Sequence, residues 1–148
     1  MSAAVDAGDG NSRSSRGYFD HDADVGVYGR GARIEDALIG AAEATFDLMT
    51  DIAMVEPIER IEVEFEEAEA DFALVTWLNA LLASAHERGL ALGRFALERH
   101  GAHWMGAAWG EAWREELPRG VDVKGATLTA LSVRESTEGW EARCVVDV

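Results

Sequence analysis

The segment from Phe72 to Gly89 restricts the fold most, because it predicts a helix with apolar residues on nearly every side. The apolar side chains that recur at helical spacing are Phe72, Leu74, Val75, Leu78, Leu81, Leu82 and Ala85. A helix that lacks a polar face has to be covered by other elements all round. We therefore expect this helix to lie at the centre of the fold and to end near Gly89.

A second helix and several strands are predicted before it. Residues 34–51 carry apolar side chains at helical spacing, and Gly40 within them indicates close packing against a neighbour. The run from Ile58 to Glu66 alternates apolar and charged residues for much of its length, which is typical of a strand with one solvent-exposed face. Two short extended segments, 18–21 and 24–29, precede the first helix, with acids in the bend between them.

After Gly89 the helical period is lost, and two hairpins are predicted. The first covers residues 94–110, and the terminal hairpin pairs an apolar strand over Lys124–Arg134 with Trp140–Val148. The order strand, helix, strand, helix and then hairpins is typical of the α+β class. We expect two helices packed on a mostly antiparallel sheet, in a two-layer single domain.

The first 17 residues differ in composition from the rest of the chain. They are small and polar, and they cannot bury enough apolar area to offset the entropy lost on ordering. We therefore expect residues 1–17 to form a disordered tail and residues 18–148 to form the domain. A chain of 148 residues is long enough for one core without disulfide bonds, and its single cysteine, Cys144, is expected in that core.

The net charge of −15 excludes some classes of partner. A protein that holds RNA by its phosphates needs a basic surface, so little direct binding of nucleic acid is expected. The excess of acid suits a basic partner protein or a divalent cation, and it also suits a high-salt habitat. No apolar run approaches the roughly 20 residues that span a bilayer, and the N-terminus does not resemble a signal peptide. We expect a cytoplasmic protein without membrane contact.

Acids lie beside apolar, strand-like runs near both ends of the chain. Asp20, Asp22 and Asp24 lie in the bend after Phe19, and Asp147 follows Val145 and Val146. If the two ends are neighbours in the fold, their carboxylates form an oxygen-rich site of the kind that hard cations prefer. The first segment is equally explained as an acidic turn whose side chains cap backbone amides, and Asp147 as a solvated residue.

Lys124 is the only lysine of the chain and precedes another apolar run. Two separated acids and one lysine, without a base and nucleophile pair, do not fit a hydrolase. This pattern is more typical of a metal-assisted contact site than of an enzyme.

Taken together, these segments resemble the archease family over residues 18–148. The markers in chain order are Phe19–Gly26, Ala44–Asp51, Trp77–Leu82, Gly110–Glu111, Val123–Thr127 and Gly139–Arg143 with Asp147–Val148. Each block alone is weak, but six blocks in the same order along the domain are specific.

The resemblance implies a non-catalytic accessory factor of the tRNA-splicing RNA ligase. That ligase joins 2′,3′-cyclic phosphate or 3′-phosphate RNA ends to 5′-hydroxyl ends with GTP and manganese. Archeases promote guanylylation of the ligase and its multiple turnover. By resemblance, Asp24 and Asp147 bind a divalent cation, expected to be calcium, with main-chain oxygens of Val148 as further ligands. Lys124 matches the lysine that the family needs for stimulation.

Four positions depart from the family pattern. Asp22 stands where a threonine is common, and Thr76 stands where many members carry an acid. After the lysine strand begins, the family usually has an aromatic residue and a histidine, where this chain has Leu128 and Thr129. A chaperone-like modulator that protects RNA-processing enzymes from aggregation is the alternative function, and it needs neither the metal nor the lysine. A metal-dependent enzyme that acts alone is a third possibility.

Overall fold

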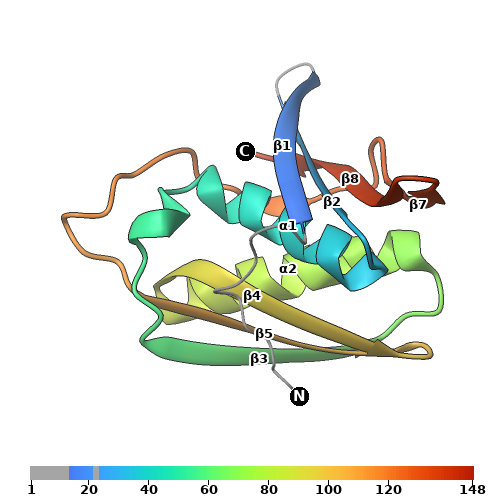
Figure 1. Ribbon diagram of the computed structural model, residues 1–148. Helices are drawn as coiled ribbons and strands as arrows, with labels where there is room; N and C mark the ends of the chain where they lie inside the picture. The colour runs from blue at the N-terminus through green and yellow to red at the C-terminus, as the bar shows by residue number, and fades with distance from the viewer. Residues whose placement is uncertain (1–13, 22–23) are drawn as a thin grey trace.

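The computed structural model describes residues 14–21 and 24–148 of the chain (Figure 1). Its elements in chain order are β1 (Ser14–His21), β2 (Asp24–Gly31), α1 (Ile34–Asp47), the short 3-10 helix η1 (Ile52–Met54), β3 (Glu59–Glu66), α2 (Ala70–Arg88), β4 (Leu90–His100), β5 (His103–Ala112), β6 (Gly125–Ala126), β7 (Ser132–Ser136) and β8 (Gly139–Asp147).

The strands form two separate antiparallel sheets. One sheet has the order β1-β2-β8-β6, with β7 also paired to β8, and the other has the order β3-β5-β4. Figure 1 shows α1 and α2 between the two sheets, and α1 contacts β2 on one side and β4 on the other. The predicted α+β class, the two helices and the antiparallel pairing are confirmed, but the helices are covered on both sides, which makes three layers where we expected two.

The apolar character of α2 explains this third layer. Its buried residues are Ala73, Leu74, Trp77, Leu78, Leu81, Leu82 and Ala85. The indole N–H of Trp77 donates to the main-chain oxygen of Leu38 in α1 at 3.0 Å, so the two helices are also joined by a buried hydrogen bond. The helix ends at Gly89, whose φ of 66° is left-handed and favours glycine.

Helix α1 lies directly on β2 because two glycines face each other. A Cβ added to Gly29 would lie 2.2 Å from the main-chain oxygen of Ala37, and one added to Gly40 would lie 3.0 Å from the Cα of Gly29. The close packing that Gly40 predicts is confirmed.

The first helix ends earlier than the predicted Asp51. After Asp47, the amide of Leu48 donates to the Thr45 main-chain oxygen, which tightens the last turn. The carboxylate of Asp47 then accepts the amide of Ile52 at 3.1 Å, and the carboxylate of Asp51 accepts the amide of Ala53. These local side-chain hydrogen bonds compete with continued helix and start η1 instead.

The predicted continuous strand over Lys124–Arg134 is wrong. It is divided into β6 and β7, which pair with the same edge of β8: Ala126 lies opposite Val146, and Ser132 lies opposite Arg143. Residues 127–131 form a bulge between β6 and β7. Two backbone hydrogen bonds hold the bulge to β8: the Thr127 amide donates to the Val145 oxygen at 2.9 Å, and the Val145 amide donates to the Thr129 oxygen at 3.1 Å. The bulge contains Ala130, whose φ is 54°.

The domain begins earlier than predicted. Residues 14–17 belong to β1 and lie opposite residues 28–31 of β2, because backbone pairing does not require apolar side chains. The rest of the predicted tail, residues 1–13, lies outside the described residues. In the part of the chain that the structure describes, no helix is long and apolar enough to cross a membrane.

Candidate functional site

The two predicted acidic positions lie on neighbouring strands. Asp24 is the first residue of β2 and Asp147 is the last residue of β8. These strands are antiparallel, with Val25 opposite Val146. One further step along this register places Asp24 beside Asp147. The two ends of the domain are therefore neighbours, as a shared site requires.

The direction of both carboxylates follows from their apolar neighbours. Val146 is fully buried in the core and Val25 packs against that core. Successive side chains of a strand point to opposite faces, so Asp24 and Asp147 project from the outer face of the sheet. Asp24 is half-buried and Asp147 is exposed. Of the other acids predicted near this end, Asp20 lies on β1, and Asp22 lies outside the described residues.

Lys124 joins the same end of the sheet through its backbone. Its amide donates to the main-chain oxygen of Asp147 at 2.7 Å, and the next residue, Gly125, pairs with Asp147. The Lys124 side chain is exposed. Three residues that are far apart in the sequence therefore meet where β2, β8 and β6 lie side by side.

The oxygen donors at this end fit a hard divalent cation. Carboxylates and main-chain oxygens are the ligands that calcium prefers. The main-chain oxygen of Asp147 is already used by Lys124, while Val148 follows the last residue of β8 and packs its side chain against the core. Within residues 14–21 and 24–148, no three or more His, Cys, Asp or Glu side chains gather as a metal site, so two carboxylates and Val148 would need water or partner oxygens to complete the coordination.

Asn79 supports this site and was not predicted from the sequence. From α2, its side-chain amide accepts the amide N–H of Ala126 at 2.8 Å and donates to the main-chain oxygen of the same residue at 3.3 Å. It thus takes the place of a neighbouring strand on the free side of β6. The only hint of this role in the sequence is that Asn79 is a polar residue inside the otherwise apolar segment 77–82.

Exposed apolar side chains flank Lys124 on both sides in the chain. Val121 is 46% exposed and Leu128 is 63% exposed. Leu128 and Thr129, which depart from the family pattern, both lie on the bulge and face solvent. Any partner that reaches Lys124 would meet this surface.

Two other reactive side chains lie apart from this end. Cys144 is buried in the core as predicted, and burial raises the pKa of its thiol to about 12, which makes it a poor nucleophile. His103 lies on β5 in the other sheet, where its ring donates hydrogen bonds to the Glu66 and Glu64 carboxylates, and these bonds raise its pKa.

Comparisons with known proteins agree on one family. The model of the archease protein family (MTH1598/TM1083) matches residues 17–148. The chain is 32% identical over 136 residues to an archease of Sulfolobus acidocaldarius and 33% identical over 138 residues to an archease of Thermococcus gammatolerans. Each match covers 88% of this chain and 96% of the relative.

Solved structures have the same fold. The solution structure of protein 1598 of Methanobacterium thermoautotrophicum has a TM-score of 0.76 and 27% identity, and the match covers 90% of this chain and 99% of that one. A crystal structure from Thermotoga maritima, described as an archease and possible chaperone, has a TM-score of 0.63. At 18% identity, with 88% of this chain and 94% of that chain covered, it supports the fold alone.

Proposed function

This chain belongs to the archease protein family, and from that premise we propose that it is a non-catalytic activator of the tRNA-splicing RNA ligase. It would promote guanylylation of the ligase and its multiple turnover in the cytoplasm. The observation that carries the proposal is the meeting of Asp24, Asp147 and Lys124 at one end of the five-stranded sheet. The positions that match the functional residues of the family are thus neighbours here.

Asp24 and Asp147 would hold the divalent cation, for which we expect calcium, with a main-chain oxygen of Val148. Such an ion, when bound, supplies a strong local positive charge that attracts phosphate oxygens. The exposed ammonium group of Lys124 adds a second cation next to it. Both groups would act on the nucleotide phosphates in the active site of the ligase, whose own nucleophile carries out the reaction.

The position of the site suits a transient complex with a protein. Lys124 and Asp147 are exposed, and Leu128 and Val121 offer apolar surface nearby. The net charge of −15 opposes RNA binding by this chain itself. Contact with the ligase through this end would bring the lysine to the phosphates without any affinity of this protein for RNA.

The test is multiple-turnover guanylylation and RNA joining by the ligase of the same source, with and without this protein. We expect Lys124→Ala and the pair Asp24→Ala and Asp147→Ala to abolish stimulation. Arg134→Ala is the matched control, because Arg134 is an exposed cation on β7, which pairs with the same edge of β8. Full stimulation by the Lys124→Ala protein, with its fold confirmed by circular dichroism, would refute the role of the lysine.

A chaperone-like activity is the second candidate, because the Thermotoga maritima relative is described as a possible chaperone. It predicts that this protein prevents aggregation of the ligase on heating. It also predicts that the Asp24→Ala and Lys124→Ala variants protect as well as the unmodified protein. Light scattering of the heated ligase, measured beside the guanylylation assay, separates the two functions.

A further inference from the structure

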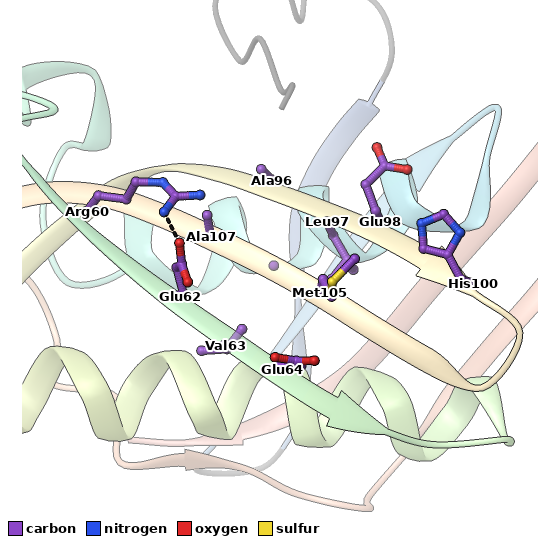
Figure 2. Close-up of a pocket in the computed structure, with 11 residues that line it drawn as sticks. Arg60, Glu62, Val63, Glu64, Ala96, Leu97, Glu98, His100, Met105 and Ala107 are labelled. Atoms are coloured by element: carbon purple, nitrogen blue, oxygen red, sulfur yellow. Dashed lines mark hydrogen bonds and ion pairs between the residues drawn. The ribbon is translucent and has the colours of Figure 1, made fainter. Parts of the chain in front are cut away.

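The outer face of the three-stranded sheet carries a groove that the proposed function does not use (Figure 2). The groove has a volume of about 420 Å³ and crosses β3, β5 and β4. Ile61, Ala108 and Phe95 face the core, so the residues that alternate with them on each strand face outward. In Figure 1 the two helices lie between this sheet and the sheet that carries Asp147.

The strand register arranges this face in rows. Glu62 and Ala96 lie on either side of Ala107, and in the next row Glu64 and Glu98 lie on either side of Met105. Figure 2 shows Met105 between these two carboxylates. The centre of the groove is therefore apolar and both of its sides are acidic.

The floor and the walls differ in exposure. Ala96 and Ala107 are 1% and 2% exposed, so they form a floor beneath longer side chains, whereas Met105 is 41% exposed. The carboxylate of Glu64 pairs with His103 at 2.7 Å. Within the described residues Glu98 has no ion pair, but the Arg33 guanidinium interacts with its carboxylate electrostatically, so an incoming cation would share this carboxylate with Arg33.

The protein already places one arginine on this face. The guanidinium of Arg60 lies 5.6 Å from the centre of the Trp109 ring and pairs with Glu62. Trp109 lies opposite Arg60 in the strand register and, two residues beyond Ala107 on β5, faces the same outer side of the sheet. Here the charged end of a basic side chain lies over an aromatic ring and is paired with a carboxylate.

We propose that this groove docks a basic extended segment of a partner protein, with an arginine or lysine stem over Ala107 and Met105 and its charge between Glu64 and Glu98. The match of an apolar floor with acidic sides selects a side chain that is itself apolar along its length and cationic at its end. A second copy of this chain is a poor occupant, because two molecules with a net charge of −15 repel each other. This surface is a second contact, separate from the end of the sheet that carries Lys124.

The experiment measures binding of the fluorescein-labelled peptide Gly-Ser-Arg-Ala-Arg-Ser-Gly to the full chain by fluorescence anisotropy. We expect the E64Q/E98Q variant to bind about three- to tenfold more weakly, since each exposed charge pair contributes modestly. The matched control is E135Q/E138Q, which removes two exposed acids of the β7–β8 hairpin and changes the net charge equally. Its affinity should change less than twofold.

Met105→Ala tests the apolar floor without a change of charge. We expect about threefold weaker binding, because the arginine stem loses a contact. An NMR titration of the unmodified protein with the peptide needs no variant. The amide resonances of Met105 and Ala107 should show the largest chemical-shift changes.

Three outcomes overturn the proposal. Equal weakening by E64Q/E98Q and by the E135Q/E138Q control would show attraction to the net charge alone. Unchanged binding by the Met105→Ala protein would show that the groove does not hold the stem. A dimer in sedimentation experiments that E64Q/E98Q disrupts would assign this face to a second copy of the chain.

Discussion

Removal of the Asn79 side chain should loosen β6 and the backbone of Lys124 without unfolding the domain. In the Asn79→Ala protein, the amide and the main-chain oxygen of Ala126 both lose their partner, at 2.8 and 3.3 Å. Each hydrogen bond contributes about 0.5–1.5 kcal/mol net, so the loss is about 1–3 kcal/mol. Because β6 has only two residues and lies at the edge of its sheet, this energy should appear as local opening.

Amide hydrogen exchange of the native protein measures this opening. A cost of 1–3 kcal/mol corresponds to exchange about 5- to 150-fold faster at Ala126 and Lys124. The Asp71→Ala protein is the matched control, because the Asp71 carboxylate on the same helix accepts the amide of Val133 in β7 at 2.8 Å. It should speed exchange at Val133 and leave Ala126 unchanged.

Two results would refute this reasoning. One is unchanged exchange at Ala126 in the Asn79→Ala protein, which would mean that pairing with β8 alone holds β6. The other is an equal increase throughout the domain, which would mean that Asn79 stabilises the whole fold. If the reasoning holds, Asn79→Ala should also reduce stimulation of the ligase, since Lys124 is then less well placed.

Three further predictions concern other parts of the domain. Because Glu66 and Glu64 raise the pKa of His103, its folded-state pKa should exceed the ordinary value of about 6.5 in an NMR titration and should fall in the Glu66→Gln protein. The stability that these His103 contacts give the fold is complete below the unfolded-state pKa and is lost as the pH rises through the folded-state pKa. Equal His103 titration curves for the two proteins would contradict the prediction. The thiol of Cys144, with its pKa raised to about 12 by burial, should resist a thiol reagent at pH 8 and react only after denaturation, and fast labelling of the folded chain would show that the strand opens. Gly29→Ala should lower the free energy of unfolding in urea by at least about 3 kcal/mol, because the new methyl group would meet the backbone of α1 at the Ala37 oxygen, which cannot move aside easily. Gly101→Ala has no atom within 4 Å and should cost only the roughly 1–2 kcal/mol of its left-handed φ of 64°. Equal costs of the two substitutions would contradict the close packing of α1 on β2.

The residues that the sequence identifies at the site are also those that the fold brings together. Asp24, Asp147 and Lys124 stand beside apolar runs, and each run becomes or adjoins a strand of one sheet. The chemistry of a site near the chain ends could thus be predicted from residue type and local pattern. Their role in binding a metal or a partner stays a prediction.

Neither the role of Asn79 nor the groove on the three-stranded sheet could be predicted from the sequence. An asparagine in an apolar helix does not indicate which backbone it binds, and Ala126 lies 47 positions away. Likewise, Glu64, Met105 and Glu98 form a row only because three strands pair in one register.

The sequence by itself determined which segments are helical or extended and which faces are apolar, because hydrophobic periodicity is a local property of the chain. It required α2 to be central, since an apolar helix has no side that water can face. Only the tertiary structure decided that two sheets cover it and that the strand after Lys124 divides around the Thr127–Leu131 bulge. Pairing partners and register depend on hydrogen bonds between residues far apart in the chain, and local periodicity does not encode them.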